Sequence, residues 1–219
     1  MKVAFGGKIM NKKIFIAIFM FGLLAAWSAQ ASADVDVDGN IAVIGAYGYD
    51  SYTGAAYVFT RSNNNWILEE AKLTVSDATN DWSSYNSVSV SGDTVIVGAT
   101  SVHKAYVFVR SDSSWTEQAI LLPKSSTPSS FGSSVAVEDD TAVITANGND
   151  SFWVFMRSSG IWTQKAKLTV AGITSGDQFG NAVSMDGDTI LVAAYGEDSF
   201  KGAVYVFTRS GEVWTQRAK

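Results

Sequence analysis

The chain has 219 residues, of which 47% are apolar and 17% are charged. This balance suits a globular protein with a sizeable core and excludes an intrinsically disordered chain. The net charge of −5 disfavours binding to nucleic acid and to anionic membranes, and the lack of cysteine excludes disulfides.

Residues 1–33 are expected to be a secretory signal peptide. Four lysines precede an uncharged run of 14 residues, Ile14 to Trp27, and the small residues Ala31, Ser32 and Ala33 follow. A membrane-spanning helix needs about 20 apolar residues, so a transmembrane anchor is the weaker alternative. Cleavage after Ala33 would change the net charge from −5 to −9, because it removes four lysines and no acidic residue. We expect the mature protein to be secreted, periplasmic or displayed at the cell surface.

The rest of the chain repeats one unit four times, with a period of about 48 residues. Each unit opens with an alternating run, a tight turn and an apolar run, as in VSVSGDTVIVGA from Val88. The alternation predicts a first strand with one buried face, and the apolar run predicts a second strand covered on both faces. An aromatic-rich third strand follows. The fourth strand alternates, as in WTQKAKL from Trp162, and places lysines on its outer face.

An arginine and a tryptophan recur five residues apart where the third strand meets the fourth. The four tryptophans are separated by 49, 47 and 52 residues. This constant offset predicts that each arginine stacks on the tryptophan of its own unit across the hairpin. The pairs are Arg61 and Trp66, Arg110 and Trp115, Arg157 and Trp162, and Arg209 and Trp214.

Four-stranded antiparallel units that bury their faces against copies of themselves are blades of a β-propeller. We therefore expect an all-β propeller, in which small pairs such as Gly98-Ala99 let neighbouring backbones approach closely. The four blades could belong to a longer protein, close a small ring, or pair with a second copy in a larger ring. Their expected bounds are about 34–80, 81–127, 128–175 and 176–219.

The repeat resembles the FG-GAP repeat of integrin α-chain-like β-propellers, in its bacterial secreted branch. The resemblance rests on FGSSVAV from Phe131 and FGNAV from Phe179, each followed by a hairpin and a pair of small residues or its equivalent. The second unit departs from it with Ser84-Tyr85 in place of Phe-Gly, and the third has Thr145-Ala146 in place of Gly-Ala. Propellers of this family usually have seven blades. The resemblance implies the fold and says little about the ligand.

The stretch DVDVDGN, from Asp34 to Asn40, begins like a calcium loop, D-x-D-x-D-G. Asp34, Asp36 and Asp38 are therefore candidate metal ligands. The repeat alignment instead places them on a first strand, where they could form its solvated side. The resemblance implies a calcium loop of the form D-x-D-x-D-G-x-x-D, but Ala42 stands at the ninth position. We expect no cofactor, with calcium as the weaker alternative.

Three loops carry aromatic residues beside carboxylates. Two are expanded loops between second and third strands, and one connects the first two blades. In integrin-like propellers such loops contact ligands, and this composition suits recognition of a protein or a glycan. Ordinary turn chemistry is the alternative explanation. The candidate ligand-binding residues are Tyr47, Asp50, Tyr52, Trp82, Tyr195 and Asp198.

The sequence gives little support to catalysis. His103 is the only histidine, and no G-x-S-x-G, H-E-x-x-H or cysteine nucleophile is present. The carboxylate pair Asp139-Asp140 occupies a repeat turn, which indicates a structural role. We expect a non-enzymatic binding or adhesion module with a protein or glycan partner and no nucleic-acid partner. One alternative is the propeller portion of a secreted polysaccharide-active enzyme whose catalytic part is absent from this chain. The other is a truncated chain that barely folds.

Overall fold

The computed structural model describes residues 34–46, 54–76, 85–112, 114–125 and 128–219. The expected signal peptide lies outside these ranges. Within them, no helix combines the length and the apolar character that crossing a bilayer requires.

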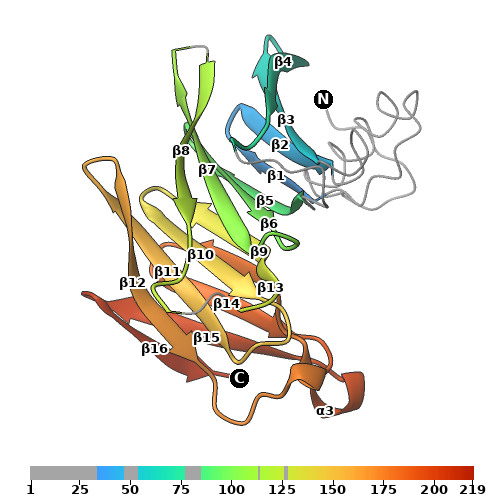
Figure 1. Cartoon of the computed structure of the whole chain (residues 1–219), viewed down its shortest axis with the longest axis vertical. Coiled ribbons are helices and arrows are strands. Elements are labelled where there is room, and N and C mark those ends of the chain that lie inside the picture. The colour runs from blue at the N-terminus through green and yellow to red at the C-terminus, as the bar shows by residue number, and fades with distance from the viewer. Residues whose placement is uncertain (1–33, 47–53, 77–84, 113, 126–127) are drawn as a thin grey trace. The chain divides into compact units, whose positions relative to one another are not determined.

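The described ranges contain four sheets, each made of four antiparallel strands in chain order (Figure 1). The first sheet comprises β1 (Val35–Asp38), β2 (Ile41–Ala46), β3 (Ala55–Ser62) and β4 (Asn65–Leu73). The second comprises β5 (Tyr85–Ser91), β6 (Thr94–Ala99), β7 (Lys104–Ser111) and β8 (Ser114–Leu121). The third comprises β9 (Phe131–Glu138), β10 (Thr141–Ala146), β11 (Ser151–Ser158) and β12 (Ile161–Thr169). The fourth comprises β13 (Phe179–Asp186), β14 (Thr189–Ala194), β15 (Ala203–Ser210) and β16 (Val213–Ala218). These sheets confirm the all-β prediction of four-stranded antiparallel units.

Each of the first three sheets packs one face on the sheet that follows it. We call this the forward face of a sheet, and the opposite side its rear face. At the first interface, Val43 and Val58 on the forward face share a buried cluster with Val95 and Tyr106 on the next rear face. Burying one such valine contributes about 1.5–3 kcal/mol, so these interfaces are the core. The apolar forward-face residues that are 0% exposed are Val43, Ala56 and Val58, then Ile96, Ala105 and Val107, then Val143, Phe152 and Val154.

The second strands have the predicted cover on both faces. Every residue of β6 and of β10 is buried, because a neighbouring sheet lies on either side of each strand. The fourth strand also follows the prediction: β12 alternates between half-buried and exposed residues, with Lys165 and Lys167 exposed.

The prediction of a first strand with one solvated face is wrong for β5. Ser87 and Ser89, which alternate with the apolar Val88 and Val90, are as buried as these valines. The reason is that the first strands of successive sheets contact one another, so β9 covers the serine side of β5. Ser89 finds a partner there, since its Oγ accepts a hydrogen bond from the amide of Val137 at 3.1 Å.

The Phe-Gly pairs begin the first strands β9 and β13, where a sheet packs on the sheet before it. Phe131 and Phe179 are 0% exposed and contribute to the second and third buried clusters. Gly98 lies so close to the next sheet that a Cβ there would be 2.1 Å from the carbonyl oxygen of Gly132. The expectation that small residues permit a close approach of backbones is therefore confirmed at this interface.

Thr145 shows how the third unit tolerates its departure from the Gly-Ala pattern. It occupies the position of Gly98, and its Oγ1 donates a hydrogen bond to the carbonyl oxygen of Gly180 in the fourth sheet at 2.6 Å. In the second sheet, the hydroxyl of Ser87 bonds the carbonyl oxygen of Gly132 at 2.9 Å. A hydroxyl thus satisfies the carbonyl oxygen of the Phe-Gly glycine at both interfaces.

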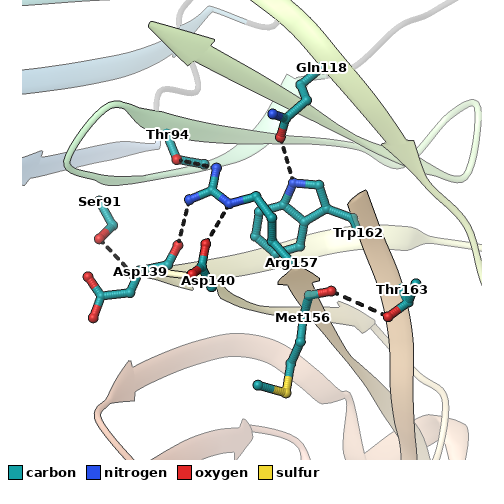
Figure 2. Close-up of polar contacts among 9 residues, drawn as sticks. All are labelled: Ser91, Thr94, Gln118, Asp139, Asp140, Met156, Arg157, Trp162 and Thr163. Atoms are coloured by element: carbon teal, nitrogen blue, oxygen red, sulfur yellow. Dashed lines mark hydrogen bonds and ion pairs between the residues drawn. The ribbon is translucent and has the colours of Figure 1, made fainter. Parts of the chain in front are cut away.

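Arg157 ties the third sheet together and links it to the second (Figure 2). Its Nε bonds Asp140 at 2.6 Å and its Nη2 bonds the carbonyl oxygen of Asp139 at 3.2 Å. Its Nη1 donates to the hydroxyl of Thr94, in the preceding sheet, at 2.9 Å. The guanidinium carbon lies 5.1 Å from the centroid of Trp162, which is cation–π distance.

The same stacking recurs in other units. It confirms the prediction that an arginine stacks on the tryptophan five residues after it. Arg61 lies 5.7 Å from the ring centroid of Trp66, and Arg209 lies 5.4 Å from that of Trp214. Arg209 also bonds Asp188, at 2.7 Å, as Arg157 bonds Asp140. The repeated turn carboxylates therefore hold arginines in place.

Candidate functional site

Two of the six candidate ligand-binding residues, Tyr195 and Asp198, lie in the described part of the chain. They belong to the connection between β14 and β15, which contains the single turn α3 (Glu197–Phe200). Tyr47, Asp50, Tyr52 and Trp82 lie outside the described residues. The site is therefore built here from the β14–β15 loop, residues 195–202.

Three consecutive residues of this loop have a left-handed backbone. The φ angles of Asp198, Ser199 and Phe200 are 51°, 57° and 68°. This conformation costs L-residues about 1–2 kcal/mol each, so the turn must be held by its surroundings. The amide of Phe200 bonds the carbonyl oxygen of Gly196 at 3.2 Å, and the amide of Gly202 bonds that of Glu197 at 3.0 Å. Strain of this kind, fixed by hydrogen bonds, is concentrated at functional sites.

Gly196 anchors the start of the loop to the preceding connection. Its amide donates to the carbonyl oxygen of Asp177 at 3.0 Å, and a Cβ on it would lie 2.2 Å from the carbonyl oxygen of Gly176. The 3-10 turn η1 (Ser175–Asp177) is in turn fixed by Thr174, whose amide and hydroxyl donate to the Asp177 carboxylate at 2.7 and 2.8 Å. These two hydrogen bonds lower the pKa of Asp177. The loop thus rests on a defined base.

Glu197 fixes the loop from the other side. Its carboxylate oxygens lie 2.9 and 2.8 Å from the hydroxyl of Tyr205, and Nζ of Lys219 lies 2.6 Å from one of them. Burial and the hydrogen bond to Glu197 raise the pKa of the Tyr205 phenol. The hydrogen bond to Glu197 likewise raises the pKa of Lys219. A carboxylate that is 16% exposed therefore holds the loop to β15 and to the last residue of the chain.

Two aromatic rings stand out from this base. Tyr195 is 49% exposed and Phe200 is 75% exposed, with ring centroids 6.2 Å apart and planes tilted by 34°. Along the loop, Asp198 comes between these two aromatic residues and Lys201 follows Phe200, and the two form an exposed ion pair of 2.8 Å. Such a pair adds little stability because solvent screens it. The loop presents two rings, a carboxylate and an ammonium group to solvent.

Sequence reasoning selected Tyr195 and Asp198 but not Phe200 or Glu197. An aromatic residue in a loop rich in polar residues was the available signal for Phe200. Glu197 has no comparable signal, because its role depends on Tyr205 and Lys219 meeting it in space.

The candidate metal ligands take part in a different kind of contact. Their oxygens accept hydrogen bonds from alternate backbone amides of β5 and the turn after it, and do not converge on one centre. In the described ranges, no group of three or more acidic or histidine residues is arranged to hold a metal ion. The contacts join Asp34 to Val88 at 3.0 Å, Asp36 to Val90 at 3.0 Å and Asp38 to Gly92 at 2.7 Å.

The same contacts recur between later sheets. We call a hydrogen bond from the amide of one first strand, or its turn, to a side chain of the preceding first strand a first-strand hydrogen bond. The acceptor changes between units but its position in the repeat does not. The further examples join Ser89 to Val137 at 3.1 Å, Ser91 to Asp139 at 3.0 Å, Ser134 to Val183 at 3.1 Å and Glu138 to Gly187 at 2.6 Å.

His103 lies in the turn between β6 and β7. Its Nδ1 accepts a hydrogen bond from the amide of Ser130 at 3.2 Å, and its own backbone is left-handed, with a φ of 56°. These contacts give the histidine a part in joining the loops of adjacent sheets.

Comparison with known proteins agrees with this architecture. The FG-GAP repeat family matches residues 162–207. No curated protein sequence matches the chain. A solved protein from Lactobacillus plantarum is similar at 18% identity and a TM-score of 0.61, over 84% of this chain and 55% of that one. A Bacteroides uniformis protein, provisionally described as a 6-phosphogluconolactonase, is similar at 12% identity and a TM-score of 0.57, over 84% and 54%.

At these identities the likeness is one of fold. The chain spans about half the length of the solved structures it matches. The chain contains an FG-GAP repeat over residues 162–207 and has the all-β architecture of four-stranded sheets that is found in β-propeller proteins.

Proposed function

We propose that this chain is an exported, non-enzymatic binding or adhesion module that recognises a protein or a glycan through the β14–β15 loop and equivalent loops. The observation that carries the proposal is the exposed ring pair of Tyr195 and Phe200 on a strained, anchored turn. Export is inferred from the signal peptide expected at residues 1–33.

The stability of the turn does not explain a phenylalanine at position 200. Glycine or asparagine would adopt a φ of 68° at lower cost, and a ring that is 75% exposed gains little from burial. A ligand that covers the ring would supply the missing contact. Aromatic residues are enriched among the residues that dominate binding energy, which favours a recognition role.

The surroundings of the rings also suit recognition. The turn is held in place without a ligand, through contacts of Gly196, Glu197 and Tyr205. Binding would therefore cost less conformational entropy. Asp198 and Lys201 can exchange their weak mutual contact for polar contacts with a hydroxyl, amide or charged group.

The test is a screen of the exported protein against a glycan array and a panel of extracellular matrix proteins. A ligand found there is titrated by calorimetry against wild type, Tyr195→Ala and Phe200→Ala. We expect each variant to bind at least about ten-fold more weakly, as befits loss of a central aromatic contact. Ile161→Ala is the matched control, because Ile161 is an apolar residue, 67% exposed, at a different hairpin.

Two outcomes would reject the proposal: no binding to any member of either panel, or equal affinity of all four proteins for a ligand that does bind. Mass spectrometry of a bound glycan after incubation tests the non-enzymatic part. We expect its mass to stay unchanged, and its cleavage would assign the chain to the enzyme class instead.

A further inference from the structure

The fourth sheet holds a carboxylate between an aromatic residue of its third strand and a lysine of its fourth strand. The hydroxyl of Tyr205 donates to the carboxylate of Glu197 at 2.8 Å, and Nζ of Lys219 lies 2.6 Å from the same carboxylate. The ammonium group of Lys219 also lies 5.8 Å from the ring centroid of Tyr205. A donor on an aromatic ring and an ammonium group stacked on that ring therefore bind one acid together.

The third sheet repeats this pair of donors without the acid. Trp153 is the third residue of β11, as Tyr205 is of β15, and it pairs across the hairpin with Lys167 of β12. Nζ of Lys167 lies 5.7 Å from the ring centroid of Trp153. Asn149 is the third residue after β10, as Glu197 is after β14, and its side-chain amide donates to the carbonyl oxygen of Ser129 at 3.3 Å. The third sheet thus has a neutral side chain at the position of the fourth sheet's carboxylate.

Neither donor of the third sheet has an acceptor within the described ranges. Nε1 of Trp153 is buried without a hydrogen bond, and the residue is 2% exposed. Phe131 packs edge-on against the Trp153 ring, with centroids 5.3 Å apart, and so fixes its position. Lys167 is exposed and forms no ion pair with a described residue. A buried N–H group without an acceptor is destabilising, so a ligand that supplies one would bind favourably.

Two further lysines flank this place. The backbone amide of Lys124 donates to the side chain of Gln164 at 2.8 Å, which brings the segment after β8 beside β12. Lys165 follows Gln164 at the β-bulge of β12. Both lysines are exposed, and neither pairs with an acidic residue in the part of the chain that the structure describes. Three ammonium groups therefore gather without a neutralising acid, on a chain whose net charge is −5. Such a patch attracts an acidic partner.

We propose that Trp153 and Lys167 bind the side-chain carboxylate of a glutamate on a partner protein, and that Lys124 and Lys165 steer its acidic segment to them. The carboxylate accepts the indole N–H of Trp153 and pairs with the Lys167 ammonium group, as Glu197 does with Tyr205 and Lys219. This site does not depend on the function proposed for the β14–β15 loop.

The burial of the indole nitrogen favours a glutamate over an acidic sugar. The carboxylate of glutamate is carried on a slender, flexible stem, which lets Glu197 reach a tyrosine that is only 3% exposed. The carboxylate of a uronic acid is attached directly to a sugar ring, whose bulk would meet the surface before the carboxylate reached Trp153.

The test is nuclear magnetic resonance of the exported protein labelled with ¹⁵N in its tryptophan indoles. The Trp153 signal is assigned by its loss in Trp153→Phe. A short oligoglutamate is titrated in, alongside oligoglutamine and an oligouronate of the same length. We expect oligoglutamate to move the Trp153 signal saturably and oligoglutamine to leave it in place. The oligouronate is expected to bind at least about ten-fold more weakly than oligoglutamate.

Lys167→Gln is expected to bind oligoglutamate about ten-fold more weakly, through loss of the charged partner. Arg217→Gln removes one positive charge from β16 and is the control, which should bind as wild type does. Both substitutions are at exposed positions, so neither disturbs the core. Three results would overturn the proposal: a Trp153 signal that does not move at about 10 mM oligoglutamate, unchanged affinity of Lys167→Gln, or tighter binding of the oligouronate than of oligoglutamate.

Discussion

Asp36 in the first sheet accepts a hydrogen bond from the amide of Val90 in the second sheet, at 3.0 Å. The same carboxylate accepts the amide of Val37 on its own strand at 2.9 Å and the hydroxyl of Ser89 at 2.9 Å. The carboxylate therefore accepts hydrogen bonds from both sheets that meet at this interface. The spacing that resembles a calcium loop is the two-residue period of a strand, since successive aspartates meet successive outward amides of β5.

Replacing Asp36 by alanine is expected to lower the free energy of unfolding by about 1.5–3 kcal/mol, the usual range for a hydrogen bond to a charged group. The amide of Val90 would lose its acceptor in a part-buried place. Urea denaturation followed by tryptophan fluorescence measures the change. Glu212→Ala, at an exposed turn, is the control and should be neutral. Equal stability of both variants would show that the contact contributes nothing.

Calcium is expected to leave the melting temperature unchanged at millimolar concentration. The carboxylates of Asp34, Asp36 and Asp38 each bond a different amide along β5, so binding a shared ion would require these bonds to break. Differential scanning fluorimetry with calcium, and with magnesium as a control, measures the effect. A rise with calcium that Asp38→Asn abolishes would contradict this prediction.

Arg157→Ala is expected to destabilise the protein by about 1–2 kcal/mol, because it removes several hydrogen bonds of about 0.5–1.5 kcal/mol each. The ion pair to Asp140 contributes the smaller part, since that carboxylate is 62% exposed and screened. Arg157→Lys should recover only part of the loss, because one ammonium group cannot reach Asp140, Thr94 and the Asp139 carbonyl oxygen together. Full rescue by lysine, measured by thermal and urea unfolding, would argue for charge alone.

Thr145→Val is expected to cost about 1–3 kcal/mol, because it removes the short hydrogen bond to the carbonyl oxygen of Gly180 and leaves that oxygen only the 3.4 Å contact from the Ser133 hydroxyl. Thr145→Ser keeps the hydroxyl and should cost clearly less, although it removes a methyl group. The two variants are compared by urea denaturation. If valine leaves the stability unchanged and serine lowers it, packing of the methyl group, and not the hydrogen bond, determines the effect.

The β14–β15 loop is expected to loosen at high pH. The pKa values of Tyr205 and Lys219 are raised above their ordinary 10.0 and 10.5, so both protonated forms are favoured in the folded state. Their contribution is complete below those ordinary values and is lost as the pH rises through the folded-state pKa values. Ultraviolet difference titration of wild type against Tyr205→Phe isolates the phenol. Glu197→Gln should return its midpoint toward 10.0, and an unchanged midpoint would exclude the contact.

The sequence was sufficient for features that repeat and depend on neighbours in the chain. Hairpins, the doubly covered second strands and the stacking of Arg157 on Trp162 all follow from period and spacing, and the structure confirms them. The serine side of β5 was assigned wrongly to solvent, because polarity alone does not distinguish water from a donor on the next sheet. The role of Glu197 could not be predicted for a related reason. Its partners, Tyr205 and Lys219, are distant in the sequence and meet it only in the folded fourth sheet.

The first-strand hydrogen bonds run in one direction, from a backbone donor in the later sheet to a side-chain acceptor in the earlier one. Every unit brings its own amides, whatever its sequence, and Asp, Ser and Glu all serve as the acceptor. A gene segment that encodes one unit can therefore be duplicated or lost without a matching change in its neighbours. The number of units can therefore change in evolution while the contacts between neighbouring units stay the same.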